Sequence, residues 1–550
     1  MVIPKTPLRA RAALGTSALL VVVSGGLFAA QTLPSASKHP VLSGPVTVAE
    51  GRLTGVPGRA RTLTVFKGVP FAAPPVGPRR WRAPEPAEKW TGVRLADTVS
   101  PSCIQTIVEE RKPWTYEFMA HGEISEDCLY LNVWTPARNA AERHPVFVYI
   151  YGGANTEGST AVPVYDGEGL ASKGLVVVTF NYRVGTMGWL AHPDLTREAS
   201  YHASGNYGLL DQIAALRWVH DNIAAFGGDP ARVTIAGQSA GAQAVHNLTA
   251  SPLAKGLFHR AIAESGSSLT TLTSAGVALA AQESDGARFA AAKGAANIAA
   301  LRAMSWQKIV APLPATAPAA GAAGRGAAGP TVRSTSVVDG YALPLPTGQI
   351  FAQGKQNDVP TLTGMNADEG GASPKPTATP ETLAAQAKQR YGDLAPQFLA
   401  LYPFTTLDDA RAIANESARD MGCATMYLWA TSRAKTAKTP VYTYFWNHAL
   451  PGPDAGTYGA FHTSEVPYAL NSLAMSTRPF TAKDHRIADI VSSYWANFAK
   501  TGNPNGSGLP NWPAVGEHAA MTMQLGDETK AILVTGTPAK LEFFTRVASR

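Results

Sequence analysis

Charged side chains are few in this sequence, and no segment gathers charge of one sign. They make up 16% of the 550 residues, with 47 Lys and Arg against 40 Asp and Glu. Three of the bases, Lys5, Arg9 and Arg11, lie in a leader without acids, so the excess in the remaining chain is smaller still. Chains that bind nucleic acid concentrate their basic residues in runs or patches. The sequence therefore indicates neither DNA nor RNA as a partner.

Long apolar runs are missing after the first 30 residues, so no later segment is predicted to span a membrane. The chain starts with basic residues followed by the apolar stretch 12–30, as in an export signal. We predict a signal peptide over residues 1–36, cut after Ala30 or Ala36, and a secreted or periplasmic protein. An uncleaved membrane anchor is the alternative, because the apolar run approaches the ~20 residues of a spanning helix. Contact with a membrane is expected only in that case.

Cysteine is rare, with three residues in the whole chain. Cys103 and Cys128 are near enough in sequence to close a surface loop, which in an oxidising compartment would contribute roughly 3 kcal/mol through loop-closure entropy. Cys423 would then remain unpaired. Three reduced cysteines in the core are the alternative. Between the first two cysteines lie aromatic residues that either line a substrate entrance or pack in the core: Trp114, Tyr116 and Phe118.

No internal repeat and no hinge divides the chain after the leader. Hydrophobic residues make up 45% of the sequence, which is typical of a globular protein with ample material for a core. Large α/β domains of this length occur as single units. We therefore predict one domain over residues 37–550.

Strands and helices alternate through the middle of the chain. Residues 144–150 predict one strand, and residues 175–182 predict another that is apolar throughout, as in strands buried on both faces. Residues 205–226 place apolar side chains at helical spacing and end at Gly227-Gly228, and residues 233–236 form the next strand. This βαβ order predicts an α/β fold with a large, mostly parallel twisted sheet, helices on both faces, and active groups at the carboxyl ends of the strands.

A serine between two glycines follows the predicted strand at 233–236. In Gly237-Gln238-Ser239-Ala240-Gly241 the serine would sit on a tight strand-to-helix turn, where the glycines leave room for the neighbouring strand and helix. Residues 242–248 can continue as a helix whose N-terminus favours negative charge near Ser239. We predict Ser239 as a nucleophile, although the pentapeptide by itself also occurs as an ordinary turn.

Glycines also follow the predicted strand at 144–150, in Tyr151-Gly152-Gly153-Ala154-Asn155. Glycines directly after a buried strand allow backbone N–H groups to point into a site. The segment suits an oxyanion hole, the set of donors that binds the negative oxygen formed during acyl transfer. Without the serine motif downstream, a plain turn would be the simpler interpretation.

A serine nucleophile needs a base, and the base needs a group that holds it. In chains with this nucleophile motif, an acid and then a histidine follow the serine on loops after later strands. Asp368 and Glu369 lie together in one such turn, and composition does not choose between them. His462 has a preceding strand and a loop of small residues, and His448 is its main rival. The other histidines in this part of the chain are His485 and His518.

Several ordered segments together resemble the type-B carboxylesterase and cholinesterase family of α/β-hydrolases. Residues 125–136, SEDCLYLNVWTP, resemble one family signature, and FGGDP with GQSAG in residues 226–241 resembles the nucleophile signature. Further likeness runs from residues 68–72 to residues 497–506 and 509–513. It therefore covers nearly the whole chain after the leader, and it implies an α/β-hydrolase fold and a secreted carboxylesterase of bacterial type.

Carried over position by position, the resemblance implies a role for each candidate residue. It makes Ser239 the nucleophile, Glu369 the acid and His462 the base. It also pairs Cys103 with Cys128, as in the family's first disulfide loop. The backbone N–H groups that it implies for the oxyanion hole are those of Gly153, Ala154 and Ala240.

The chain departs from many members of the family at two positions. Gln238 stands where many have glutamate, which removes a buried charge beside the site. Tyr151 begins a segment in which a number of members have histidine followed by three glycines. Neither departure removes a catalytic group, because the oxyanion donors belong to the main chain and Ala154 can donate if its backbone angles are allowed.

The predicted activity is hydrolysis of small-molecule carboxylic esters by a serine hydrolase that forms an acyl-enzyme, with no metal and no organic cofactor. One alternative is a catalytically silent binding or adhesion protein on the same scaffold, which would be expected to lack a member of the triad. The other is a lipase or cholinesterase with the same chemistry, although nothing in the sequence defines an aromatic cage for quaternary ammonium. The ester itself and the oligomeric state are not indicated.

Overall fold

The computed structural model describes residues 41–42, 44–268, 273–313, 332–370, 378–518, 520–548 and 550. The chain divides into two units, Met1–Ser37 and Lys38–Arg550. The predicted signal peptide at residues 1–36 lies outside the described residues, so its prediction is untested. The fold of the second unit follows.

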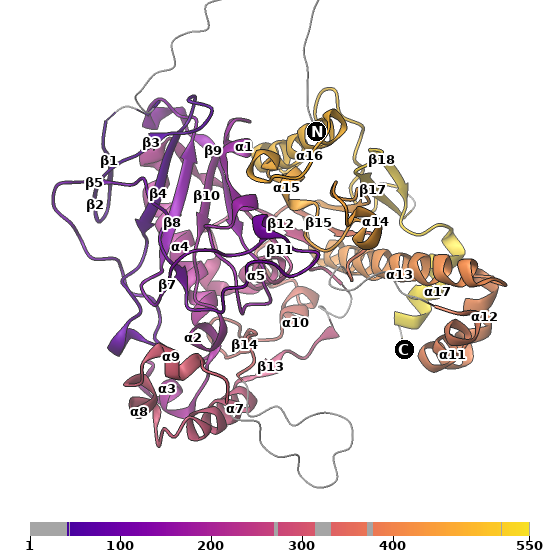
Figure 1. Ribbon diagram of the computed structural model, residues 1–550, viewed down its shortest axis with the longest axis horizontal. Coiled ribbons are helices and arrows are strands. Elements are labelled where there is room, and N and C mark those ends of the chain that lie inside the picture. The colour runs from indigo at the N-terminus through magenta and orange to yellow at the C-terminus, as the bar shows by residue number, and fades with distance from the viewer. Residues whose placement is uncertain are drawn as a thin grey trace, which may run out of the picture. The chain divides into compact units, whose positions relative to one another are not determined.

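An 11-stranded mixed sheet runs through the Lys38–Arg550 unit (Figure 1). Its strands are β3 (Val56–Pro57), β4 (Thr64–Pro70), β8 (Tyr130–Thr135), β9 (His144–Ile150), β10 (Val176–Phe180), β11 (Gly228–Gln238), β12 (Arg260–Glu264), β15 (Thr361–Asn366), β16 (Val441–Trp446), β17 (Met521–Leu525) and β18 (Lys530–Leu533). Their spatial order is β18-β17-β16-β15-β12-β11-β9-β10-β8-β4-β3. From β17 to β10 all neighbours are parallel, and antiparallel strands flank them at both edges. The predicted mostly parallel sheet is confirmed.

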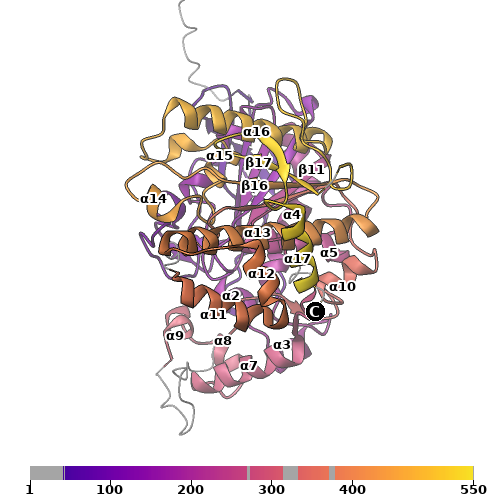
Figure 2. The same ribbon diagram turned by 90° about the vertical axis from the view of Figure 1, so that its right-hand side faces the viewer.

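Helices cover both faces of the sheet, which explains why its central strands are apolar along their whole length. One face carries α16 (Ala482–Thr501), and the other carries α4 (Tyr207–Asn222), α5 (Ala240–Ala250) and α13 (Leu407–Thr436) (Figures 1 and 2). All five residues of β10 are buried. The core is therefore continuous from one helical layer through the sheet to the other.

The helix predicted at 205–226 forms as α4 and a final 3-10 turn, Ile223–Phe226. It stops at Gly227, whose φ is 74°. A Cβ at this position would lie 2.2 Å from the Cβ of Ala137, so only glycine fits there. The chain then enters β11, which is longer than the strand predicted at 233–236 and ends directly before Ser239.

Two groups of peripheral helices have cores of their own. One group packs against α13 through Phe398, Tyr402 and Phe543 and consists of α11 (Pro380–Tyr391), α12 (Ala395–Leu401) and α17 (Pro538–Ala548). The other consists of α7 (Leu279–Ala292), α8 (Ile298–Arg302) and α9 (Trp306–Val310).

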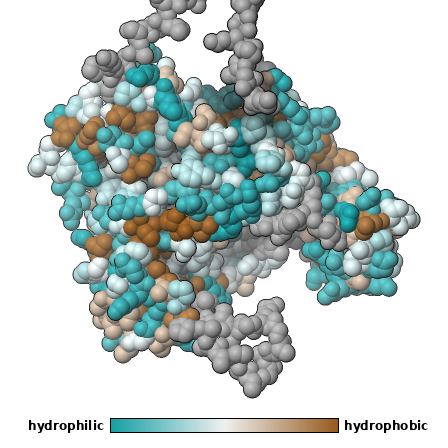
Figure 3. Space-filling view, viewed as in Figure 1, coloured by the Kyte–Doolittle hydropathy of each residue, from teal (hydrophilic) through white to brown (hydrophobic). Residues whose placement is uncertain are grey.

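The face of the molecule in Figure 3 is mainly hydrophilic, and its hydrophobic residues gather in separate patches. This agrees with an interior that holds most of the large apolar side chains. Within the described ranges, no helix has both the length and the apolar character that crossing a membrane requires.

The loops after β15 and β16 are joined beyond the edge of the sheet. Asp368 and Phe461 form an isolated parallel bridge, and the Asp368 N–H donates to the Ala460 carbonyl at 3.0 Å. The Asn366 side chain donates to the Phe461 carbonyl at 2.8 Å. These contacts bring residues 368–369 next to residue 462, although 93 positions separate Glu369 from His462.

Candidate active site

Ser239 occupies the turn between β11 and α5. Its backbone has φ 60° and ψ −120°, a strained conformation for a residue with a side chain that costs on the order of 1–3 kcal/mol. The Ser239 N–H donates to the Glu264 carbonyl at 2.9 Å, which holds the turn. A Cβ on Gly237 would lie 2.6 Å from the Gly241 carbonyl, and one on Gly241 would lie 2.1 Å from the Ile150 carbonyl oxygen. Both flanking glycines are therefore required.

The glycine segment after β9 lies directly against this turn. A Cβ on Gly152 would lie 2.6 Å from the Gln238 carbonyl oxygen and 3.1 Å from the Cβ of Ser239. Gly153 and Ala154 have φ of 91° and 55°. Alanine adopts this left-handed region at a cost of about 1 kcal/mol relative to glycine. The sequence did not show whether Ala154 could adopt such backbone angles, and in the structure it adopts them.

Tyr151, one of the two departures from the family resemblance, anchors this segment to the end of β10. Its hydroxyl donates to the Tyr182 carbonyl at 3.0 Å, and the Tyr182 hydroxyl donates to the Tyr151 carbonyl at 2.8 Å. The two rings stack with centroids 4.4 Å apart, and both residues are buried. The departure at Tyr151 therefore has a packing role.

His462 and Glu369 meet through the joined loops after β15 and β16. The Nδ1 of His462 lies 2.5 Å from the Oε2 of Glu369, and the other carboxylate oxygen accepts from the Asn366 N–H at 2.7 Å. Asp368 points elsewhere and pairs with Arg419 on α13 at 2.9 Å. Of the two adjacent acids that composition did not separate, Glu369 is the one that contacts the imidazole.

The rival histidine, His448, lies in a different network. Its Nε2 is 2.9 Å from an oxygen of Asp484, and its Nδ1 is 2.7 Å from an oxygen of Asp527. It does not line the cavity beside Ser239. His485 and His518 are exposed and do not line it either.

A cavity of about 190 Å³ lies beside Ser239. Its wall combines the turn of the serine, the loop of His462 and the segment after β9. The residues from these three sources are Gly152, Gly153, Ala154, Gln238, Ser239, His462 and Thr463. The cavity brings the predicted nucleophile, base and two oxyanion donors to one space. A hydroxyl, an imidazole held by a carboxylate, and backbone N–H groups are the parts that acyl transfer requires.

The segment between Cys103 and Cys128 forms another side of the cavity. Trp114 and Phe118 line it, and the Trp114 indole N–H donates to the His462 carbonyl at 3.1 Å. Tyr116 is 62% exposed and stacks on His121 outside the cavity. Trp114 and Phe118 thus line the cavity and also pack in or against the core, so both interpretations hold for them, whereas Tyr116 fits neither.

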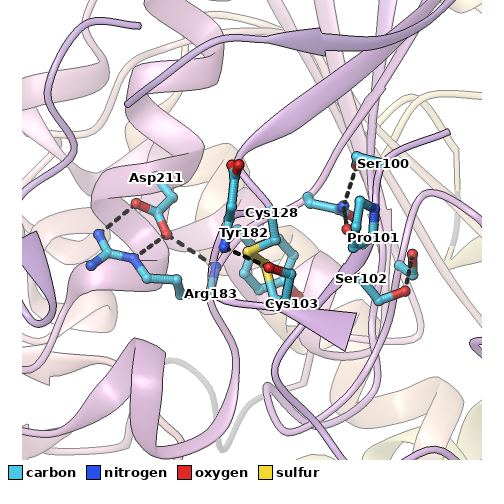
Figure 4. The surroundings of a disulfide bond; sticks show 12 residues. Ser100, Pro101, Ser102, Cys103, Cys128, Tyr182, Arg183 and Asp211 are labelled. Atoms are coloured by element: carbon cyan, nitrogen blue, oxygen red, sulfur yellow. Dashed lines mark hydrogen bonds and ion pairs between the residues drawn. A yellow bond between two sulfur atoms is a disulfide. The ribbon is translucent and has the colours of Figure 1, made fainter. Parts of the chain in front are cut away.

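Cys103 and Cys128 form a disulfide that joins the two ends of this segment. Their Cα atoms are 5.1 Å apart, and both residues are buried. Figure 4 shows the bond beside the buried ion pair of Arg183 and Asp211, whose Nη2 and Oδ1 are 2.7 Å apart. The predicted disulfide is confirmed, and the alternative of three reduced cysteines is wrong. Cys423 is buried and unpaired.

Arg111 and Glu157 form an ion pair in the cavity wall, and no sequence motif predicts it. Two guanidinium nitrogens of Arg111 lie 2.8 and 2.9 Å from the two carboxylate oxygens of Glu157. These hydrogen bonds raise the pKa of Arg111. The Glu157 N–H donates to the Gly153 carbonyl at 3.1 Å. The pair therefore links the disulfide segment to the turn that carries the predicted oxyanion donors.

Gln238 lies against the imidazole of His462. Its Nε2 is 3.2 Å from the Nε2 and 3.3 Å from the Nδ1 of the ring, and its side-chain oxygen Oε1 accepts from the Thr463 hydroxyl at 3.4 Å. The side chain is neutral, so it adds no charge next to the ring. Among the residues that the structure describes, no group of three or more His, Cys, Asp or Glu side chains is arranged to hold a metal ion.

Comparison with known proteins gives consistent matches along the chain. A family model described as the carboxylesterase family matches residues 43–544. The chain is 38% identical over 480 residues to fumonisin B1 esterase of Sphingopyxis macrogoltabida, which covers 84% of this chain and 83% of that protein. It is 33% identical over 518 residues to liver carboxylesterase 1 of Oryctolagus cuniculus, which covers 88% of each. A solved structure of PNB esterase aligns with a TM-score of 0.72 and 30% identity, over 91% of this chain and 99% of that one.

Proposed function

The chain belongs to the carboxylesterase family and is a carboxylic ester hydrolase, and from this premise we propose that Ser239, His462 and Glu369 carry out the reaction. The observation that carries the proposal is the 2.5 Å contact between His462 and Glu369 at a cavity whose wall also holds Ser239 in its strained turn. A nucleophile and a base at one cavity, with an acid that holds the base, support acyl transfer.

In the first half of the reaction, the hydroxyl oxygen of Ser239 attacks the ester carbonyl while His462 takes its proton. Glu369 holds the imidazole through Nδ1 and stabilises the imidazolium that forms. The carbonyl oxygen becomes an oxyanion, which accepts hydrogen bonds from the N–H groups of Gly153, Ala154 and Ala240. Removing one such donor typically costs about 3 kcal/mol of transition-state stabilisation. The alcohol then leaves with the proton from His462, and the acyl group remains on Ser239.

In the second half, a water molecule attacks the acyl-enzyme and gives a proton to His462. The tetrahedral intermediate collapses, the carboxylic acid leaves, and Ser239 recovers its proton from the imidazole. Ala240 is the first residue of α5, where the backbone N–H has no partner within the helix. Its position supports a role as a donor in both halves of the reaction.

The proposed substrate is a small-molecule carboxylic ester. The relatives named fumonisin B1 esterase and liver carboxylesterase 1 support this class of substrate. A catalytically silent binding protein is the weaker alternative, since all three proposed triad members are present. We further propose that residues 1–36 are an export leader and that residues 37–550 form one hydrolase domain. The disulfide supports export to an oxidising compartment.

The test is covalent labelling with a fluorophosphonate probe, followed by turnover of p-nitrophenyl esters of increasing acyl length. We expect the label on Ser239 and a loss of about 10⁶-fold in kcat in Ser239→Ala. Ser284→Ala, at an exposed position on α7, is the matched control and should keep both labelling and turnover. A label on another residue, or unchanged turnover in Ser239→Ala, would overturn the assignment.

A further inference from the structure

The turn after β9 has three consecutive residues with left-handed backbone angles, and two of them are not glycine. The φ values are 91° at Gly153, 55° at Ala154 and 59° at Asn155. A residue with a Cβ adopts this region at a cost, and such strain persists only where the surrounding structure over-determines it. The turn therefore needs contacts that hold its shape, and the three proposed triad side chains supply none of them.

The Gly153 carbonyl oxygen accepts three hydrogen bonds, all from the two residues that follow this turn. The N–H groups of Thr156 and Glu157 donate to it at 2.9 and 3.1 Å, and the Thr156 hydroxyl donates to it at 3.1 Å. A carbonyl oxygen has two lone pairs, so these three donors occupy it fully. The direction of the carbonyl is thereby fixed toward residues 156–157.

The direction of the Ala154 N–H follows from the direction of this carbonyl. Both belong to one peptide group, which is planar and trans, so its C=O and its N–H point in opposite directions. Contacts that hold the Gly153 carbonyl on one side thus hold the Ala154 N–H on the other. Ala154 lines the cavity beside Ser239, and its N–H donates to no other residue that the structure describes. This N–H is therefore available to a group in the cavity.

Asn155 anchors the same turn to two other segments. Its side-chain amide donates to the Ser334 carbonyl at 3.1 Å, and its own carbonyl accepts from the N–H of Gly185 at 2.7 Å, where α2 (Gly185–Trp189) begins. Asparagine is also among the residues that adopt left-handed angles most readily. The turn is thus held through Asn155 as well as through Thr156, and neither residue lines the cavity.

We propose that the side chains of Thr156 and Asn155 position the Ala154 N–H for the oxyanion that forms on the reacting ester. The proposal rests on the oxyanion role assigned above to Ala154. Both are positioning residues, because they act through the Gly153 carbonyl and the strained turn and not on the substrate. They allow alanine to serve where the backbone angles favour glycine. Loss of either side chain should spare substrate binding and weaken binding of the transition state, in which charge develops on the oxygen.

The first measurement is kcat and KM for p-nitrophenyl acetate in full-chain variants at Thr156. Thr156→Val keeps the branched shape but cannot donate, whereas Thr156→Ser keeps the donor. We expect Thr156→Val to lower kcat about 10-fold with little change in KM, which is less than the roughly 100-fold loss typical when an oxyanion donor is removed outright. Thr156→Ser should keep most of the wild-type kcat.

Thr431→Val is the matched control for the loss of a hydroxyl. Thr431 lies on α13, and its hydroxyl donates to the Leu428 carbonyl three residues before it at 3.1 Å, with the spacing and distance of the Thr156 contact to Gly153. It does not line the cavity beside Ser239. Its kcat and KM should match those of the wild type.

The second measurement is the Ki of a trifluoromethyl ketone. The Ser239 oxygen bonds to the carbonyl carbon of this inhibitor while His462 takes the hydroxyl proton, and the hemiketal oxyanion uses the same donors as the transition state. In Thr156→Val, Ki should rise by the factor by which kcat/KM falls. Asn155→Ala, which loses the contact with Ser334, should show the same parallel change in the two constants.

Wild-type kcat and Ki in Thr156→Val would overturn the proposal. A higher KM with unchanged kcat would do so too, because it would assign Thr156 to substrate binding, and so would an equal loss of kcat in Thr431→Val. If Thr156→Val does not fold, Asn155→Ala decides by the same two constants.

Ser239→Ala separates this proposal from the function on which it rests. If Ser239→Ala is inactive while Thr156→Val and Asn155→Ala behave as the wild type, only the positioning role is refuted. If Ser239→Ala keeps its turnover, the assigned function fails and the positioning role fails with it.

Discussion

Two histidines on the loops after β16 each contact carboxylates, but their surroundings differ. His462 contacts Glu369 at 2.5 Å and lines the cavity that holds Ser239. His448 contacts Asp484 at 2.9 Å and Asp527 at 2.7 Å, so carboxylates occupy both of its ring nitrogens. A histidine–acid contact therefore does not identify a catalytic base. What distinguishes the two sites is the cavity: His462 lines the space that also holds Ser239, whereas His448 does not line it.

The network of His448 serves the fold. Asp484 accepts from the Thr481 N–H at 2.8 Å and completes the capping box at the start of α16, and it also accepts from the Tyr468 hydroxyl at 2.7 Å. His448 thus connects the end of β16 to the beginning of α16. The comparison teaches that the same pair of side chains supports catalysis in one place and helix capping in another.

The largest expected effect separates the two histidines by activity. His462→Ala removes the proposed base and should lower kcat by about 10⁶-fold, as loss of the base does in a comparable triad. His448→Ala should leave kcat for p-nitrophenyl acetate close to that of the wild type. Steady-state kinetics on both folded variants checks this. Comparable losses in the two variants would break the comparison.

A smaller effect separates the two adjacent acids. Glu369→Gln keeps the shape of the side chain but cannot stabilise the imidazolium, and we expect kcat to fall by about 10⁴-fold. Asp368→Asn weakens the contact with Arg419 and should reduce kcat far less. The measurement is kcat at the pH optimum of each variant. A greater loss in Asp368→Asn would mean that the acid was assigned to the wrong member of the pair.

The smallest effect concerns stability. Here we expect the larger change at the His448 site and the smaller change at the His462 site. Although burial opposes its ionisation, hydrogen bonds from Thr481 and His448 hold the pKa of Asp484 below its ordinary value of 3.8. Its ionised form therefore stabilises the fold above that value, and the contribution is lost as pH falls below it. We expect Asp484→Asn to lower the free energy of unfolding by about 1–3 kcal/mol at pH 7.

Urea unfolding at pH 7 and at pH 3 tests this, since the difference from the wild type should shrink at the lower pH. Glu369→Gln is the matched variant at the other histidine and should change stability less. An Asp484→Asn variant whose deficit grows on acidification would contradict the assigned direction.

Much of the fold and the family could be predicted from the sequence because local patterns carry them. The α/β sheet, the ester hydrolase activity and the disulfide are confirmed. The strand at 144–150 has the predicted bounds, since its apolar run ends at the glycine segment. The helix at 205–226 ends where a glycine is sterically required. The tight turn at Ser239 could be predicted because it requires glycine at positions 237 and 241, and the sequence has glycine at both.

Side-chain directions and distant pairs could not be predicted in this way. Composition did not separate Asp368 from Glu369; the family resemblance chose Glu369, and the junction of their loop with residues 460–461 gives the physical reason why Glu369 reaches His462. Arg111 and Glu157 are 46 positions apart and match no motif. Glu264 and Glu465 are buried, and no local pattern predicts the burial of an acidic side chain. The catalytic roles themselves stay predictions until variants are measured.

The disulfide between Cys103 and Cys128 closes a segment that can affect substrate preference without affecting the reaction chemistry. The segment that it closes supplies Arg111, Trp114 and Phe118 to the cavity, whereas Ser239 stands on the sheet. Replacing that segment, or changing its length, would remodel the walls around an incoming ester without moving the strand that presents the hydroxyl. Substrate preference can thus diverge between related chains, or be altered by segment exchange, while the reaction chemistry is inherited unchanged.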